Sequence, residues 1–180
     1  MNLKHVHFGT VDKFHVVVEI PKGSGIKYEY DEKMRVFVPK FFWRDGVTLP
    51  YNYRFVAETA AEDNDHLDII ILGDDPIIQG AVVECVAIGI LKLLDRGVPD
   101  HKIIALPTKH PLLPSWDNID TLSPGERHDL ERKIVNILNE MARQKNKIIE
   151  IQGFFGKEEA KRELECAHRK FDKEKAVSFL

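Results

Sequence analysis

The hydrophobic and polar positions change their period about two thirds of the way along the chain. Before residue 120, apolar residues gather in short runs that are rich in β-branched and aromatic side chains and separated by turn-forming residues, which is typical of strands. These runs cover residues 15–20, 26–30, 35–38, 51–58, 67–72, 81–94 and 102–106. After residue 120, the apolar positions recur at helical spacing. We therefore predict an α+β chain with its strands first and its helices last.

The last third of the chain predicts two helices around a short strand. Residues 123–126, Ser-Pro-Gly-Glu, form a capping box with proline at the first helical position. A short strand is expected over residues 147–151, and Gly153 and Gly156 then introduce a second helix. That helix carries one apolar stripe, made of Ala160, Leu164, Ala167 and Phe171. We expect both helices to pack on the strands.

The strand pattern indicates a curved sheet. The short early runs suggest a meander, and Gly89 in the middle of residues 81–94 is placed to bend that long strand. A small closed barrel would leave no strand edge exposed. Neither an internal repeat nor a long linker divides the chain, so we expect one domain over residues 1–180.

Composition and charge narrow the class of protein. The 180 residues are 43% hydrophobic and 31% charged, as in a soluble globular domain. A net charge of −3 argues against a dedicated nucleic-acid partner or an anionic membrane surface. The longest apolar stretch, residues 80–94, contains Glu84 and Lys92 and is too short to cross a bilayer. Cys85 and Cys166 form no CxxC pair, which favours the reducing cytoplasm.

The densest group of carboxylates precedes the apolar residues 69–71. Asp63, Asp65 and Asp68 are spaced so that three hard oxygen ligands could converge on a cation. The alternative is an acidic loop that keeps a hairpin solvated, which is the usual role of a charge run. The loop lacks the glycine and the closing glutamate of an EF-hand.

Further charged residues stand at other strand ends. Asp95, Asp100 and Lys102 lie between two apolar runs, and this arrangement alone would be an ordinary polar hairpin. Lys27 and Glu29 are two apart on a strand and share one face, where a cross-strand ion pair is the simpler interpretation. Together, carboxylates and lysines at several strand ends are typical of Mg²⁺-dependent phosphoryl transfer.

Glu19 lies among valines and an isoleucine. If its side chain faces inward, burial requires a cationic partner or a metal. The pattern leaves an outward orientation equally open.

Several motifs, in the same order along the chain, resemble the soluble family I inorganic pyrophosphatases. They are Val18-Glu19-Ile20-Pro21, Ile26-Lys27-Tyr28-Glu29, Pro50-Tyr51-Asn52-Tyr53, the D-x-D-x-x-D signature of residues 63–68, Gly89-Ile90-Leu91-Lys92, Asp95 with Asp100 and Lys102, and Ile104-Ala105-Leu106-Pro107. The resemblance covers nearly the whole chain. It implies a small closed five-stranded OB-like β-barrel flanked by two C-terminal helices, and a homo-oligomer, usually a hexamer. The implied activity is hydrolysis of pyrophosphate to two phosphates by in-line attack of a metal-bridged hydroxide.

The resemblance also implies a role for each matching residue. Asp65 would be the general base. The metal ligands would be Asp63, Asp68, Asp95, Asp100 and Glu19. The substrate-binding residues would be Lys27, Glu29, Lys40, Tyr53, Lys102 and Arg143. Mg²⁺ is the expected cofactor, although oxygen ligands also admit Mn²⁺ or Zn²⁺.

Part of the phosphate-binding set departs from the family pattern. Lys40 stands where the family has an arginine, and Leu49 stands where it has a tyrosine. Met141 and Ala142 stand where a Tyr-Lys pair normally grips phosphate, with Arg143 the nearest cation. One interpretation is a working pyrophosphatase in which other arginines compensate, namely Arg44, Arg54 or Arg143. The other is a divergent homologue with weak activity or another phosphoanhydride substrate. We favour the first, because carboxylates without metals would repel one another.

A third hypothesis is an OB-fold protein that binds single-stranded nucleic acid. Such barrels use aromatic side chains interleaved with cations, and Tyr51, Tyr53, Arg54 and Phe55 could form such a patch. The neighbouring acidic clusters argue against this hypothesis.

Overall fold

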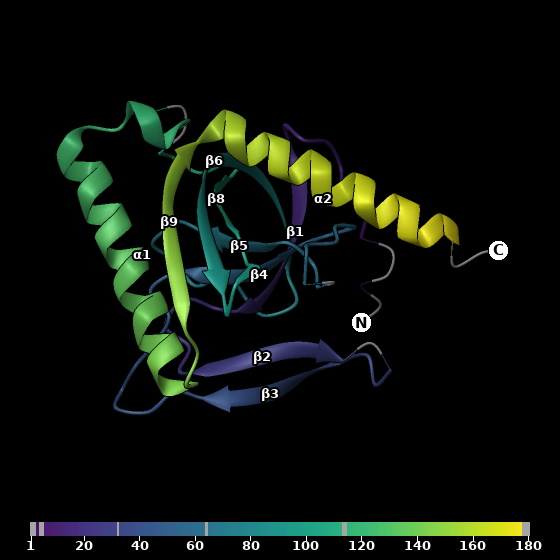
Figure 1. Cartoon of the computed structure of the whole chain (residues 1–180), viewed down its shortest axis with the longest axis horizontal. Helices are drawn as coiled ribbons and strands as arrows, with labels where there is room; N and C mark the ends of the chain where they lie inside the picture. The colour runs from purple at the N-terminus through teal and green to yellow at the C-terminus, as the bar shows by residue number, and fades with distance from the viewer. Residues whose placement is uncertain (1–2, 4–5, 32, 64, 113–114, 178–180) are drawn as a thin grey trace.

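Five strands close into a ring in the computed structural model, which describes residues 3, 6–31, 33–63, 65–112 and 115–177. Around the ring the order is β1 (Phe14–Ile20), β4 (Asn52–Val56), β5 (Asp68–Ile71), β8 (Lys102–Pro107) and β6 (Val82–Asp95). β6 then pairs with β1 and completes the ring. The predicted five-stranded barrel is therefore confirmed (Figure 1).

β5 and β8 are the parallel pair in this ring, and the other neighbours run antiparallel. Their register aligns Asp68 with Lys102 and Ile71 with Ala105. Because both strands are buried on both faces, their sequences are nearly continuous apolar runs. Parallel pairing places the first residues of both strands side by side.

The predicted meander is wrong at its start. β2 (Ile26–Asp31) and β3 (Val36–Phe42) pair with each other in a separate two-stranded sheet, which lies beneath the barrel in Figure 1. β3 continues past its predicted end at residue 38, through Pro39 and Lys40. Proline is tolerated there because β3 lies at the edge of the small sheet.

β6 bends as predicted. Its register against β8 shifts between Ala87 and Gly89, and beyond this point β6 also pairs with β9 (Ile149–Gly156). A Cβ atom at Gly89 would lie 2.5 Å from Ile119 Cδ1 and 2.9 Å from the Phe155 backbone oxygen, so the close approach of these two residues explains this glycine. The 14-residue strand thus pairs with β8 as far as Leu91 and with β9 from Gly89 onward.

The first helix, α1 (Pro124–Gln144), begins where the sequence predicts. The Ser123 hydroxyl accepts a hydrogen bond from the Glu126 backbone N–H, and the Glu126 carboxylate accepts one from the Ser123 N–H. Leu130, Ile134 and Leu138 form its buried face. The expected packing of this helix on the strands is therefore confirmed.

The second helix, α2 (Lys157–Val177), begins directly after β9. β9 is longer than predicted and contains both Gly153 and Gly156, and the helix follows Gly156 directly, as predicted. A Cβ atom at Gly156 would lie 1.9 Å from an oxygen of Asp120, so close approach explains this glycine. No helix in the described part of the chain is long and apolar enough to span a membrane.

The hydrophobic core lies on both sides of the barrel strands. One cluster joins Val16 and Ile69 to the α2 residues Ala160 and Leu164, and the other joins Ile104 to α1. Because both faces are apolar, polar side chains gather at the strand ends. Both cysteines are free.

Candidate active site

Charged side chains from four barrel strands meet at one end of the ring. Asp68 and Lys102 open the parallel strands β5 and β8, so they lie side by side. Arg54 on β4 lies at the same end of the barrel, because its neighbour Phe55 pairs with Asp68 in the antiparallel register. The next strand, β1, then brings Glu19 to Arg54, since Val18 pairs with Arg54. Strand pairing alone thus assembles the cluster.

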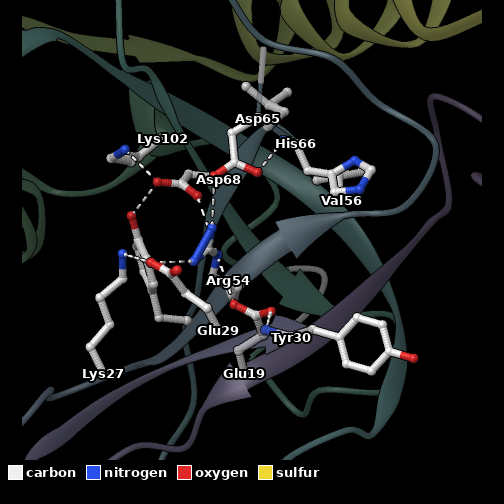
Figure 2. A network of polar contacts seen from close by, with 12 residues as sticks. Glu19, Lys27, Glu29, Tyr30, Arg54, Val56, Asp65, His66, Asp68 and Lys102 are labelled. Atoms are coloured by element: carbon white, nitrogen blue, oxygen red, sulfur yellow. Dashed lines mark hydrogen bonds and ion pairs between the residues drawn. The ribbon is translucent and has the colours of Figure 1, made fainter. Parts of the chain in front are cut away.

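The Arg54 guanidinium lies among the carboxylates, as Figure 2 shows. Its Nε atom is 2.9 Å from the nearest Glu19 oxygen, and its second terminal nitrogen is 3.0 Å from Asp65 Oδ2. Glu29 and Asp68 oxygens each lie 3.8 Å from a guanidinium nitrogen. Only 6% of Arg54 is exposed. Burial lowers the pKa of Arg54, but the charges of Asp68, Glu19 and Asp65 outweigh burial and raise the pKa above its usual value.

Asp68 accepts hydrogen bonds from two neighbouring side chains. The Tyr53 hydroxyl donates a 2.6 Å hydrogen bond to Asp68 Oδ2, and the Lys102 ammonium donates one of 2.5 Å to the same oxygen. Burial alone would raise the pKa of Asp68, yet Lys102 and Arg54 lower it to about 2. Lys102 also pairs with Asp100, whose own pKa is raised by burial despite that contact.

Glu19 faces inward, which settles the orientation that the sequence left open. It is 2% exposed, and its carboxylate accepts a 2.7 Å hydrogen bond from the Tyr30 backbone N–H. Burial raises the pKa of Glu19 to about 7, although Arg54 and the Tyr30 N–H oppose the shift.

Lys27 and Glu29 pair with each other within one strand, and not across strands as their spacing suggested. The Lys27 ammonium is 2.5 Å from Glu29 Oε1, and both residues lie on β2. Burial opposes ionisation of Glu29, but the hydrogen bond from Lys27 lowers its pKa below the usual value.

A cavity of about 390 Å³, which we call the acidic cavity, opens at this end of the barrel. It collects most of the residues proposed from the sequence: Lys27, Tyr53, Asp63, Asp65, Asp68, Asp95, Asp100 and Lys102. Glu19 and Glu29 line a neighbouring cavity of about 660 Å³. Arg54 and Asp65 line both cavities, so the Arg54 side chain forms part of the wall between them.

Arg143 does not reach the acidic cavity. Its guanidinium pairs with Glu140 on the same helix at 2.6 Å, and its side chain is 65% exposed. Arg44 does not line the acidic cavity either. Its backbone N–H donates a hydrogen bond to the side-chain oxygen of Gln144. Neither arginine therefore lines the acidic cavity. Lys40 lies on β3, and its positive charge helps to lower the pKa of Glu29.

Two lysines that the sequence analysis missed line the acidic cavity. Lys145 follows the end of α1, and its ammonium lies 5.3 Å from the Phe41 ring centre and 5.0 Å from that of Trp43. Burial lowers the pKa of Lys145 to about 8, and the charges of Lys27 and Lys147 add to this effect. Lys147 pairs with Asp95. The one sequence signal for Lys145 is its place directly after the end of α1, two residues beyond the exposed Arg143.

The carboxylates of the acidic cavity suit a hard divalent cation. Asp95 Oδ1 is buried and accepts no hydrogen bond from the described residues, so it keeps a lone pair for a ligand. The remaining donors are aspartate oxygens, which Mg²⁺ and Mn²⁺ prefer. In the described ranges no three such groups already converge on one point, and Lys102 and Arg54 lie between them.

The aromatic residues that the nucleic-acid hypothesis relies on do not form an exposed patch. Tyr53 and Phe55 are buried, and the Arg54 side chain is directed into the carboxylates. Bases could not stack on these side chains without opening the barrel.

A closed barrel whose end carries aspartates, lysines and a buried arginine is typical of enzymes that act on phosphate groups with divalent cations. The model of the family described as inorganic pyrophosphatase matches residues 16–172. The chain therefore belongs to the inorganic pyrophosphatase family.

Known relatives agree with this assignment. An inorganic pyrophosphatase of Campylobacter jejuni is 34% identical over 173 residues, which are 95% of this chain and 99% of the relative. The structure of an inorganic pyrophosphatase from Coxiella burnetii superposes with a TM-score of 0.83 at 30% identity, covering 92% of this chain and 99% of that chain. A soluble inorganic pyrophosphatase of Zea mays is 34% identical over 78% of this chain, and the match spans 64% of that longer relative.

Proposed function

We propose that the chain hydrolyses inorganic pyrophosphate to two phosphates with the help of divalent cations. The observation that carries the proposal is the acidic cavity, in which five aspartates and several lysines of one barrel end face a common space. Membership of the inorganic pyrophosphatase family supports this choice among phosphate-directed reactions.

The cations of the acidic cavity would bind the substrate. Pyrophosphate is a compact polyanion, and Lys27, Lys102, Lys145 and Lys147 offer ammonium groups from different elements. The Tyr53 hydroxyl adds a neutral donor. Lys145 would supply a charge near Met141 and Ala142, which both line the cavity. This arrangement favours a working enzyme over the alternative of a weakly active homologue.

Asp63, Asp68, Asp95 and Asp100 would hold divalent cations. Glu19, predicted as a further ligand, lines the neighbouring cavity and pairs with Arg54. Mg²⁺ is the expected metal, and Mn²⁺ or Zn²⁺ are alternatives with the same donor set. Bound cations would neutralise phosphate charge and lower the pKa of the attacking water.

Asp65 would act as the general base. Its side chain is 59% exposed and borders the acidic cavity, and Arg54 holds one of its oxygens at 3.0 Å. It would accept the proton of the attacking water as the new P–O bond forms. The bond between the bridging oxygen and the attacked phosphorus then breaks, and the second phosphate leaves with the bridging oxygen.

The decisive test is phosphate release by the purified protein from pyrophosphate, ATP and tripolyphosphate. Rapid release from pyrophosphate with Mg²⁺, and its loss when EDTA removes the metal, is the expected result. Faster release from ATP or tripolyphosphate would support another phosphoanhydride substrate. No release with Mg²⁺, Mn²⁺ or Zn²⁺ would refute the proposed function.

We also propose a cytoplasmic homo-oligomer, a hexamer by family resemblance, built from one domain over residues 1–180. The separate β2–β3 sheet exposes Met34, Val36 and Phe42, which are 58%, 48% and 62% accessible. Exposed apolar side chains in one hairpin favour contact with another protein surface. Light scattering coupled to size-exclusion chromatography tests the assembly, and a monomer at micromolar concentration would contradict it.

A further inference from the structure

One positively charged group stands at the centre of four carboxylates. The Arg54 guanidinium is 2.9 Å from Glu19 and 3.0 Å from Asp65, and 3.8 Å from both Glu29 and Asp68. Figure 2 shows these carboxylates around the guanidinium on different sides. We call Glu19, Glu29, Asp65 and Asp68 the four-carboxylate cluster.

The other cations near the cluster serve only part of it. Lys27 pairs with Glu29, and Lys102 pairs with Asp68. Among the described residues, Arg54 is the cation that pairs with Glu19 and Asp65. Since Glu19 is almost completely buried, its charge depends on a nearby cation.

Either a divalent cation or a guanidinium could balance the negative charge of the four-carboxylate cluster. Carboxylate oxygens from separate elements are the type of donor that Mg²⁺ and Mn²⁺ bind. Here they surround the Arg54 guanidinium instead, which does not lose its proton at physiological pH. It is also tethered to β4, so dilution or chelation cannot remove it.

We propose that Arg54 is a built-in cation that takes the place of one divalent ion in the four-carboxylate cluster. The protein would therefore bind fewer metal ions than its carboxylates alone would allow. The inference rests on the proposed function only in that the acidic cavity binds divalent cations, and it concerns metal stoichiometry rather than turnover.

Replacing Arg54 tests the inference directly. In Arg54→Ala, the four carboxylates keep their ion pairs with Lys27 and Lys102 but lose the cation that pairs with Glu19 and Asp65, so their repulsion favours uptake of a metal. Mn²⁺ binding without pyrophosphate, followed by electron paramagnetic resonance of the free ion, should give one more bound Mn²⁺ per chain than the unaltered protein. Equal stoichiometry in a folded variant would overturn the proposal.

Two further variants provide controls. Lys92→Ala removes the cation that pairs with Glu159 between β6 and α2, away from the cluster, and should bind the same number of ions as the unaltered protein. Arg54→Lys keeps a positive charge in the cluster and should also gain no ion. An extra Mn²⁺ in either variant would mean that the added binding does not come from loss of charge at the cluster, which would overturn the proposal.

Arg54→Gln guards against misfolding of the alanine variant, because it removes the charge but keeps most of the side-chain volume. Its thermal unfolding midpoint should lie below that of the unaltered protein in EDTA, and Mn²⁺ should raise this midpoint more than it raises that of the unaltered protein. If Mn²⁺ raises the unfolding midpoint of neither Arg54→Ala nor Arg54→Gln more than that of the unaltered protein, a divalent ion cannot replace the guanidinium and the proposal fails.

The outcome is separate from that of the activity assay. Gain of a bound ion in a protein without pyrophosphate turnover would sustain the inference and refute the proposed function. Turnover by the unaltered protein with no gained ion in the folded variants would do the reverse.

Discussion

At the residue scale, the positions of single side chains decide what the acidic cavity can do. Asp65 is the one aspartate of the proposed site that combines substantial exposure with a direct contact to Arg54. It can therefore exchange a proton with solvent while the guanidinium holds it in place. This combination suits a base better than a deeply buried ligand.

Asp65→Asn should lower kcat for pyrophosphate by about 10²- to 10⁴-fold, because the amide cannot accept the proton. The fold should persist, since the side chain is 59% exposed and asparagine retains an oxygen near Arg54. Steady-state kinetics and circular dichroism measure the two effects. Asp74→Asn, which alters a fully exposed carboxylate near Lys22, is the matched control. Unchanged kcat in Asp65→Asn would remove this residue from the role of base.

The Lys145 ammonium should make substrate binding depend on pH. Because its pKa is lowered to about 8, the side chain is mostly charged at pH 7 and mostly neutral at pH 9. KM for pyrophosphate should therefore rise by roughly three- to tenfold across this interval, as a charged hydrogen-bond donor is lost. The Lys145→Arg variant stays charged throughout and should lack most of that rise. The same rise in both proteins would place the titrating group elsewhere.

At the element scale, local signals predicted the structure where one segment determines it. The capping box at Ser123 and the repeat through Leu130 and Ile134 identify α1 because both are properties of a single helix. By contrast, the extent of β9 depends on its pairing with β6 and on the close approach of Asp120 to Gly156. The periodicity of a single segment cannot predict contacts with residues that are distant in the sequence.

Ser123→Ala should destabilise the protein by about 1 kcal/mol, because the N-cap loses its side-chain acceptor. The free energy of unfolding in urea measures the effect. Ser115→Ala, at an exposed position before α1, should change that free energy by less than about 0.5 kcal/mol. Equal effects of the two substitutions would indicate that the capping box contributes little.

The candidate site shows the same limit of sequence analysis. The spacing of Asp63, Asp65 and Asp68 within one loop marks an acidic group, and family resemblance relates it to Asp100 and Lys102. The central place of Arg54 follows from the registers of β4 against β1 and β5, which no local pattern encodes. Lys145 and Arg143 look alike in sequence, and only the direction of the chain after α1 separates them.

At the scale of the whole molecule, the barrel and α2 share one core. Leu164 is fully buried in the cluster that includes Val16 and Ile69. Leu164→Ala should cost about 2–5 kcal/mol in the free energy of unfolding, because it leaves a cavity in that cluster. Leu112→Ala, at a residue 39% exposed, is the control and should cost far less. A loss below about 1 kcal/mol for Leu164→Ala would mean that the helix can repack on the barrel.

The closure of the ring sets the order in which the chain can fold. β1 pairs with β6, so Val16 finds its partner Val83 only after residues 17–82 have been made. Its neighbours in the core include Leu164, which is synthesised after all five barrel strands. Contacts between residues so distant in sequence slow folding, because a long loop must close before burial stabilises it. On the ribosome, the apolar side chains of the barrel that pack against α2 therefore stay uncovered until α2 has been made.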